Sequence, residues 1–93
     1  MQKYVKIAFE SRGLDPAFDP PPLCEYCEYL MLRWEMTTNE VRKSKDVEHI
    51  FWRKGKLLLD PTNLLFICRE HHSQKWGYDM KMLWKEIVLS KLV

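Results

Sequence analysis

Residues 63–76 read "NLLFICREHHSQKW", an apolar run followed directly by a cysteine and two adjacent histidines. Two residues separate Cys68 from His71, and this gap lets a tight turn offer both side chains to one metal ion. The same gap occurs upstream in "CEYC", between Cys24 and Cys27. Two such pairs supply the four ligands that tetrahedral zinc requires. We therefore predict a structural Cys3His zinc site made by these four residues.

Other interpretations of these residues stay open at this point. A single Cys-x-x-Cys is also found as a pair of buried small residues or as a redox motif. Zinc can also be bound by Cys68 and His72, which leaves His71 for another role. We favour His71, because its spacing from Cys68 repeats the spacing of the first pair. Neighbouring residues on a helix point about 100° apart, so the two histidines can face two different sites.

The composition indicates one small globular domain, since 46% of the 93 residues are hydrophobic and 30% are charged. A chain of this length buries a limited core, so a bound metal would add needed stability. The N-terminal "MQKYVKIAFE" does not resemble a signal peptide, and no apolar run approaches the roughly 20 residues of a membrane span. We expect a cytoplasmic protein, where reducing conditions favour metal binding by the three cysteines over a disulfide.

The first half of the chain gives mixed signals. Residues 1–13 fit a short strand or a helical turn equally well, and residues 24–36 fit a strand or a helix. Between them, four prolines in residues 16–22 predict an extended connector, because consecutive prolines form neither a helix nor a central strand.

The second half is easier to assign. Residues 46–52 are rich in β-branched and aromatic side chains and predict a strand. A turn at "RKGK" followed by "LLLD", residues 57–60, suggests that this strand returns as a β-hairpin. Helix is predicted from Arg69 onward, and residues 78–93 carry apolar residues at the spacing of an amphipathic helix.

Basic residues are concentrated in one segment, although the net charge of +2 does not by itself indicate a nucleic-acid-binding protein. The segment from Arg42 to Lys56 contains six basic residues against two acidic ones: Arg42, Lys43, Lys45, Arg53, Lys54 and Lys56 against Asp46 and Glu48. Such an excess can contact a phosphate backbone, and it is also compatible with an ordinary solvated hairpin.

The order of these motifs resembles that of the zinc-containing HNH nuclease family. The matching residues run from Cys24 to Trp76: Cys24-x-x-Cys27, Glu48-His49-Ile50, Asn63-Leu64, and Cys68-x-x-His71-His72-x-x-Lys75. The resemblance implies an α+β ββα-metal (His-Me finger) domain that cleaves DNA phosphodiester bonds with a divalent cation. It divides the chain into an N-terminal segment and connector at 1–23, a nuclease core at 24–76, and a C-terminal helix at 77–93 that packs on the core.

The resemblance also implies a role for each matching residue. Glu48 and His72 would bind the catalytic cation, for example Mg²⁺, Mn²⁺ or Ni²⁺. His49 would be the general base that takes a proton from the attacking water, and Asn63 would hold the loop that orients this base. Lys75 matches a basic residue that often follows the last histidine and would contact a phosphate. Independently of the resemblance, the charges of Arg53, Lys54 and Lys56 suit contacts to the phosphates of duplex DNA, with weak sequence preference because few side chains are suited to reading bases.

Three features depart from the family pattern. Position 71 commonly holds Cys, the acidic position before His49 commonly holds Asp, and "FWRKGK" replaces the usual proline and paired glycines. These departures keep two alternatives open. One is a catalytically weak or inactive zinc module that binds a host protein or nucleic acid, and the other is a zinc-ribbon DNA binder with a single metal. The small size is typical of proteins from phages and other mobile elements.

Overall fold

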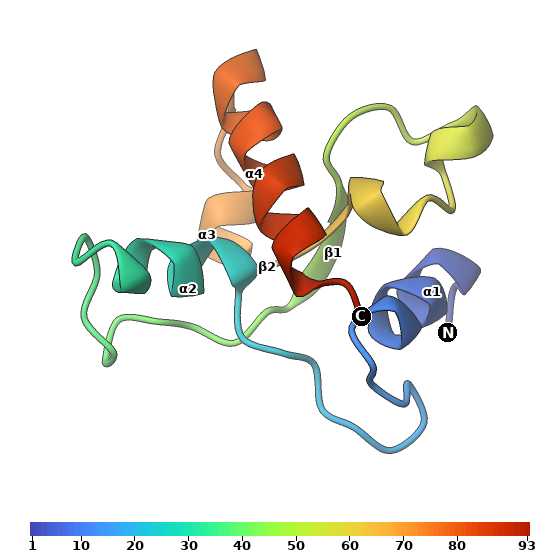
Figure 1. The fold of residues 1–93 in the computed structure, drawn as a ribbon, viewed down its shortest axis with the longest axis horizontal. Helices are drawn as coiled ribbons and strands as arrows, with labels where there is room; N and C mark the ends of the chain where they lie inside the picture. The colour runs from blue at the N-terminus through green and yellow to red at the C-terminus, as the bar shows by residue number, and fades with distance from the viewer.

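The computed structural model describes all residues 1–93 and has an α+β fold. Four helices surround a two-stranded antiparallel sheet (Figure 1). The elements in chain order are α1 (Lys3–Ser11), α2 (Glu25–Leu32), β1 (Asp46–His49), the 3-10 turns η1 (Gly55–Leu57) and η2 (Pro61–Asn63), β2 (Leu64–Ile67), α3 (Arg69–His72) and α4 (Tyr78–Lys91). Strands β1 and β2 and helix α3 thus follow one another in the chain, with the second ligand pair, Cys68 and His71, at the end of this β–β–α unit. None of the helices has the length and apolar character needed to cross a membrane.

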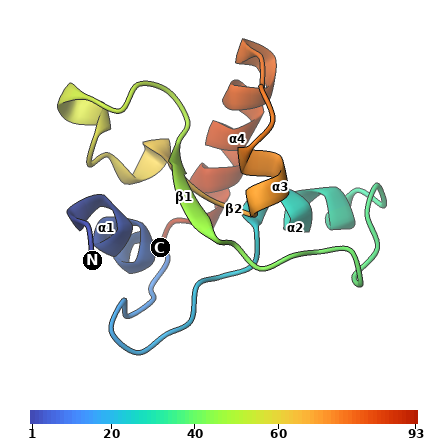
Figure 2. The same cartoon turned by 180° about the vertical axis from the view of Figure 1, so that it is seen from behind.

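The sheet is the middle layer of the molecule, with α1 on one face and the other helices on the opposite face (Figures 1 and 2). Its register pairs Asp46 with Ile67 and His49 with Leu64. All four residues of β2 are buried, whereas those of β1 are half-buried. A strand buried on both faces is apolar throughout, as "LLFI" is. The mixed strand β1 is therefore the edge that brings polar side chains to the surface.

Each face of β2 supports its own apolar cluster. Leu65 and Ile67 pack with the cysteines and with Trp84 and Val88 of α4, the helix that runs from Tyr78 to Lys91 where residues 78–93 were predicted to be helical. On the opposite face Leu64 and Phe66 pack with Ala8 and Phe9 of α1, and the Phe9 and Phe66 rings meet edge to face at 5.2 Å.

The predicted return strand at residues 57–60 is wrong. Gly55–Leu57 forms a 3-10 turn, and the strand that pairs with β1 is Leu64–Ile67. The reason is burial: the three leucines at 57–59 are only half-buried, and Pro61 has no N–H to donate to a ladder. The first strand is also shorter than predicted, since it ends at His49 instead of continuing to Trp52, which is 71% exposed.

Two undecided segments are helices, namely residues 3–11 and 25–32. The connector predicted to be extended over residues 16–22 is so in part: it contains no helix or sheet strand, but residues 16–18 form a turn in which the Asp19 N–H donates to the Asp15 carbonyl at 2.8 Å. It is fixed near its end, where the Ser44 hydroxyl donates to the Pro22 carbonyl at 2.6 Å. The helix predicted from Arg69 is a single turn that ends at His72.

A buried ion pair connects the N-terminal helix to the rest of the fold. Arg12 donates from Nε and from one terminal nitrogen to the two carboxylate oxygens of Glu25, at 3.0 and 2.7 Å, and both side chains are about 5% exposed. Arg12 also donates to the Leu64 carbonyl at 2.6 Å. Glu25 in turn accepts the backbone N–H of Phe66 at 3.0 Å. One pair of side chains thus joins α1, α2 and β2.

We predict that Arg12→Ala lowers the free energy of unfolding by about 3–5 kcal/mol, because it leaves the Glu25 carboxylate buried without its cation. Urea denaturation at fixed zinc concentration measures this change. Arg33→Ala is the matched control, since Arg33 forms its ion pair with Glu35 at the surface and its loss should leave the denaturation midpoint nearly unchanged. Equal midpoints for the two variants would contradict the assigned role of Arg12.

Candidate functional site

Three cysteines and one histidine converge where the start of α2 meets the end of β2. The metal-binding atoms of Cys24, Cys27, Cys68 and His71 all lie within 4.8 Å of one another. Nδ1 of His71 lies 3.3, 3.5 and 3.9 Å from the sulfurs of Cys68, Cys27 and Cys24, and the sulfurs of Cys27 and Cys68 are 3.8 Å apart. The predicted Cys3His group is thus present as a cluster able to hold a metal ion.

These distances match the edges of a zinc tetrahedron. Zinc bonds of about 2.3 Å to sulfur and about 2.0 Å to nitrogen give edges of roughly 3.8 Å between sulfurs and roughly 3.5 Å between sulfur and nitrogen. Burial raises the pKa of the Cys24 thiol to about 12, raises that of Cys68 and lowers that of His71, so it disfavours the charged form of each group. A divalent cation would supply the positive charge that buried thiolates require.

Aromatic rings enclose this cluster. The Tyr26 ring lies 4.8 Å from the His71 imidazole and 5.8 Å from the Trp84 ring. Trp76 completes the group, since its indole N–H donates to the His71 carbonyl at 2.7 Å. The outer contacts of the ligands therefore hold the short helix α3 in place, as outer contacts generally do around metal ligands.

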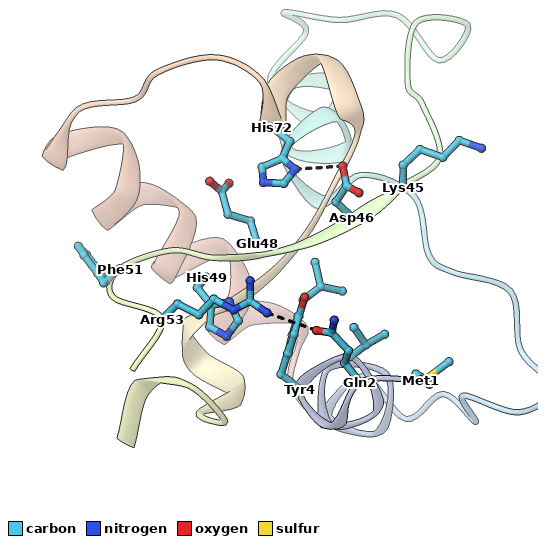
Figure 3. A pocket seen from close by; sticks show the side chains of 12 residues that line it. Met1, Gln2, Tyr4, Lys45, Asp46, Glu48, His49, Phe51, Arg53 and His72 are labelled. Carbon is cyan, nitrogen blue, oxygen red and sulfur yellow. Dashed lines mark hydrogen bonds and ion pairs between the residues drawn. The ribbon is translucent and has the colours of Figure 1, made fainter. Parts of the chain in front are cut away.

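The two adjacent histidines serve different parts of the structure. While His71 joins the cysteines, His72 donates from Nδ1 to Oδ2 of Asp46 at 2.9 Å (Figure 3). The alternative in which Cys68 and His72 form the second ligand pair is therefore wrong. The predicted divergence of neighbouring helical side chains is confirmed here.

Glu48 lies on the same face of β1 as Asp46, two residues further along the strand. Its carboxylate points toward the side of His72 that does not contact Asp46 (Figure 3). The Oε2 atom is buried and has no hydrogen-bond partner, and burial raises the pKa of this carboxyl group. A buried oxygen without a partner is costly, so this atom is suited to a ligand from outside the chain.

Glu48 and His72 offer the hard and borderline donors that divalent cations accept. With its Nδ1 proton donated to Asp46, His72 keeps Nε2 free as a ligand atom, an arrangement common around metal sites. Asp46 was missed by the sequence reasoning. Its signal was the two-residue spacing from Glu48, which places both carboxylates on one face of a strand.

His49 lies on the opposite face of β1, as expected for neighbours on a strand. Its Nε2 atom is 2.9 Å from the Leu58 carbonyl oxygen. A carbonyl can only accept, so Nε2 carries the proton and Nδ1 has the free lone pair. The orientation of the imidazole is therefore set in part by the backbone of the loop that follows β1.

Asn63 holds that loop. Its side chain is fully buried: Oδ1 accepts the Phe51 N–H at 2.9 Å, and Nδ2 donates to the carbonyls of Leu57 and Trp52 at 3.1 and 3.4 Å. These bonds connect both ends of residues 51–57 to the start of β2. The loop that carries Arg53 is thereby fixed from one buried side chain.

An open pocket of about 610 Å³ spans the edge of β1 and reaches both of its faces. Glu48, His49 and His72 line it, together with Asp46, Arg53 and residues of α1. Of the four basic residues predicted to contact DNA, only Arg53 lines the pocket, whereas Lys54, Lys56 and Lys75 are exposed elsewhere. Lys45, at the other end of the pocket, was not among them.

Comparison of the chain with protein-family models, with curated proteins and with solved structures found no match. The interpretation of the pocket and of the Cys3His cluster therefore depends on the geometry described above.

We predict that the chain binds one zinc ion at the Cys3His cluster and that its removal by a chelator lowers Tm by roughly 15 °C or more. A ligand present at about 1,000 times its Kd contributes about 4 kcal/mol, and each kcal/mol shifts Tm by about 4–8 °C in a domain of this size. In cobalt-substituted protein, His71→Ala should abolish the visible bands of tetrahedral coordination by three sulfurs and one nitrogen, and His72→Ala should leave them unchanged. The reverse pattern would contradict the assignment.

We also predict that Asn63→Ala lowers the free energy of unfolding by about 1–3 kcal/mol, because it leaves buried loop groups without partners. Hydrogen exchange of the Phe51 amide should become faster in this variant. Asn39→Ala, at an exposed position, is the control and should change neither quantity. Unchanged Phe51 protection in Asn63→Ala would show that this side chain does not hold the loop.

Proposed function

We propose that this chain is a metal-dependent DNA endonuclease of the HNH type, which hydrolyses phosphodiester bonds at the pocket along β1. The observation that carries the proposal is the unpartnered buried Oε2 atom of Glu48, which lies on the His72 side of the strand that also carries His49. Glu48 and His72, which would bind the cation, thus lie on one face of β1, and His49, whose Nδ1 is free, lies on the other. This arrangement agrees with the roles implied by the family resemblance.

In the proposed reaction the residues of β1 act from its two faces. His49 takes a proton from water through Nδ1, the resulting hydroxide attacks phosphorus, and the bond to the leaving 3′-oxygen breaks. Glu48 and His72 would hold one divalent cation, which would supply positive charge to neutralise the phosphate and the leaving oxygen. Asp46 keeps the free nitrogen of His72 directed toward Glu48.

Basic side chains at the pocket support an anionic polymer as the substrate. Arg53 and Lys45 lie at the pocket, and Lys54 and Lys56 extend the positive charge along the exposed loop. Contacts of this kind position a phosphate backbone and do not read sequence. We therefore propose duplex DNA with weak sequence preference as the substrate class.

A zinc module that binds a partner without catalysis is the second candidate. It is favoured by Glu48, whose longer side chain replaces the usual aspartate, and by the loop after β1, which forms 3-10 turns in place of a hairpin. Binding to a host protein or to nucleic acid that survives both His49→Ala and His72→Ala, with no cleavage, would support this candidate.

Plasmid nicking in the presence of Mg²⁺, Mn²⁺, Ni²⁺ or Zn²⁺ tests the nuclease proposal. We predict cleavage that EDTA abolishes and that falls by at least about 100-fold in His49→Ala, since a general base typically contributes 10²–10⁴-fold. Glu48→Gln and His72→Ala should lower cleavage at limiting cation concentration.

Glu86→Gln, exposed on α4 outside the pocket, is the matched control for Glu48→Gln and should cleave like the parent chain. Variants purified in parallel also control for contaminating nucleases. An intact plasmid with all four ions, or full activity in His49→Ala, would overturn the proposal.

A further inference from the structure

The N-terminal helix forms one wall of the candidate pocket, although it lies outside the segment that resembles a nuclease. Gln2, Tyr4 and Val5 line the pocket together with His49 and Arg53 (Figure 3). Because α1 is anchored to the core through Phe9 and Arg12, its first turn is held beside the end of β1. The side chains of this turn are therefore placed where they can act on the pocket.

Tyr4 contacts both of the pocket groups proposed to act on substrate. Its ring centroid lies 4.6 Å from that of His49, with the two planes tilted by 56°. The guanidinium carbon of Arg53 lies 4.9 Å from the centre of the same ring, within the range of a cation–π contact. Arg53 also donates to Oε1 of Gln2 at 3.3 Å.

These contacts limit the movement of two flexible side chains. The bond from His49 Nε2 to the Leu58 carbonyl fixes one atom of the imidazole, and the ring can still pivot about that bond. The neighbouring Tyr4 ring restricts this pivot. Arg53 is exposed on the loop after β1, so without Tyr4 and Gln2 its guanidinium would sample many positions.

We propose that Tyr4 is a positioning residue that fixes the His49 imidazole and the Arg53 guanidinium at the pocket, so that α1 is part of the active site. The catalytic consequence of this inference rests on the proposed nuclease function, whereas the positioning itself does not. Tyr4 acts through its ring and not through its hydroxyl, since both contacts are to the ring.

The positioning is tested without any activity measurement, by ¹³C NMR relaxation of the His49 ring in zinc-loaded protein. The order parameters of the ring C–H bonds should be high in the parent chain and in Tyr4→Phe. Tyr4→Leu should lower them, because the Leu58 carbonyl still holds Nε2 while the neighbouring ring that restricts the pivot is gone. Unchanged order parameters in Tyr4→Leu would overturn the proposal, because the ring would then be unnecessary for fixing His49.

The catalytic consequence is tested by steady-state cleavage of a short duplex. Tyr4→Phe should stay within about twofold of the parent, and Tyr4→Leu should lower kcat by about tenfold or more, since small misplacements of a reacting group can cost up to about 10²-fold. Arg53→Gln should mainly raise KM. Ile7→Ala, which weakens the packing of α1 away from the pocket, is the control and should leave kcat within about twofold.

The outcomes separate the two proposals. If Ile7→Ala lowers kcat as much as Tyr4→Leu does, the effect of Tyr4 is general loosening of α1 and the inference is wrong. If the parent chain cleaves nothing, the proposed function fails, and the NMR spectra still decide whether Tyr4 positions His49.

Discussion

The convergence of Cys24, Cys27, Cys68 and His71 on one point is the constraint on which the rest of the structure depends. The first two ligands begin α2, and the last two lie at the junction of β2 and α3. A chain of this size buries few residues, so a metal ion bound by this cluster would join these distant segments and replace packing that a larger domain supplies. Around it, Tyr26, Trp76 and Trp84 form the apolar shell of the larger core.

The start of α2 links this cluster to the opposite side of the sheet. Glu25 lies next to Cys24 in the chain, and its carboxylate binds both Arg12 and the backbone of β2. Helix α2 and strand β2, which meet at the Cys3His cluster, therefore also fix α1. Because α1 carries Tyr4, fixing this helix also sets the position of one wall of the pocket. The Cys3His cluster and the polar pocket thus depend on the same small set of packed elements.

The two faces of strand β1 present different groups to the pocket, carboxylates on one face and an imidazole on the other. Asp46 and Glu48 face α3, where the carboxyl group of Asp46 has a lowered pKa because it accepts the hydrogen bond of His72, and that of Glu48 has a raised pKa because it is buried. Two carboxyl groups two residues apart thus have opposite environments. Such divergence is typical of functional sites, and His49 on the other face is held by contacts of a different kind.

The Cys3His cluster, the C-terminal helix and the strand with Glu48 and His49 could all be predicted from the sequence, because each depends on local spacing or periodicity. Only the tertiary structure decided which strand returns to β1, since the apolar runs "LLLD" and "LLFI" look alike until burial on both faces distinguishes them. The spacing of Asp46 from Glu48 indicates a shared strand face, but the partner of Asp46, His72, is distant in the chain and is known only from the tertiary structure. The contact of Tyr4 with His49 likewise joins residues that are far apart in the sequence. Candidate ligands within one turn can be recognised from their spacing in the sequence. Contacts between α1, the sheet and the other helices join distant segments and therefore form only when these elements pack together.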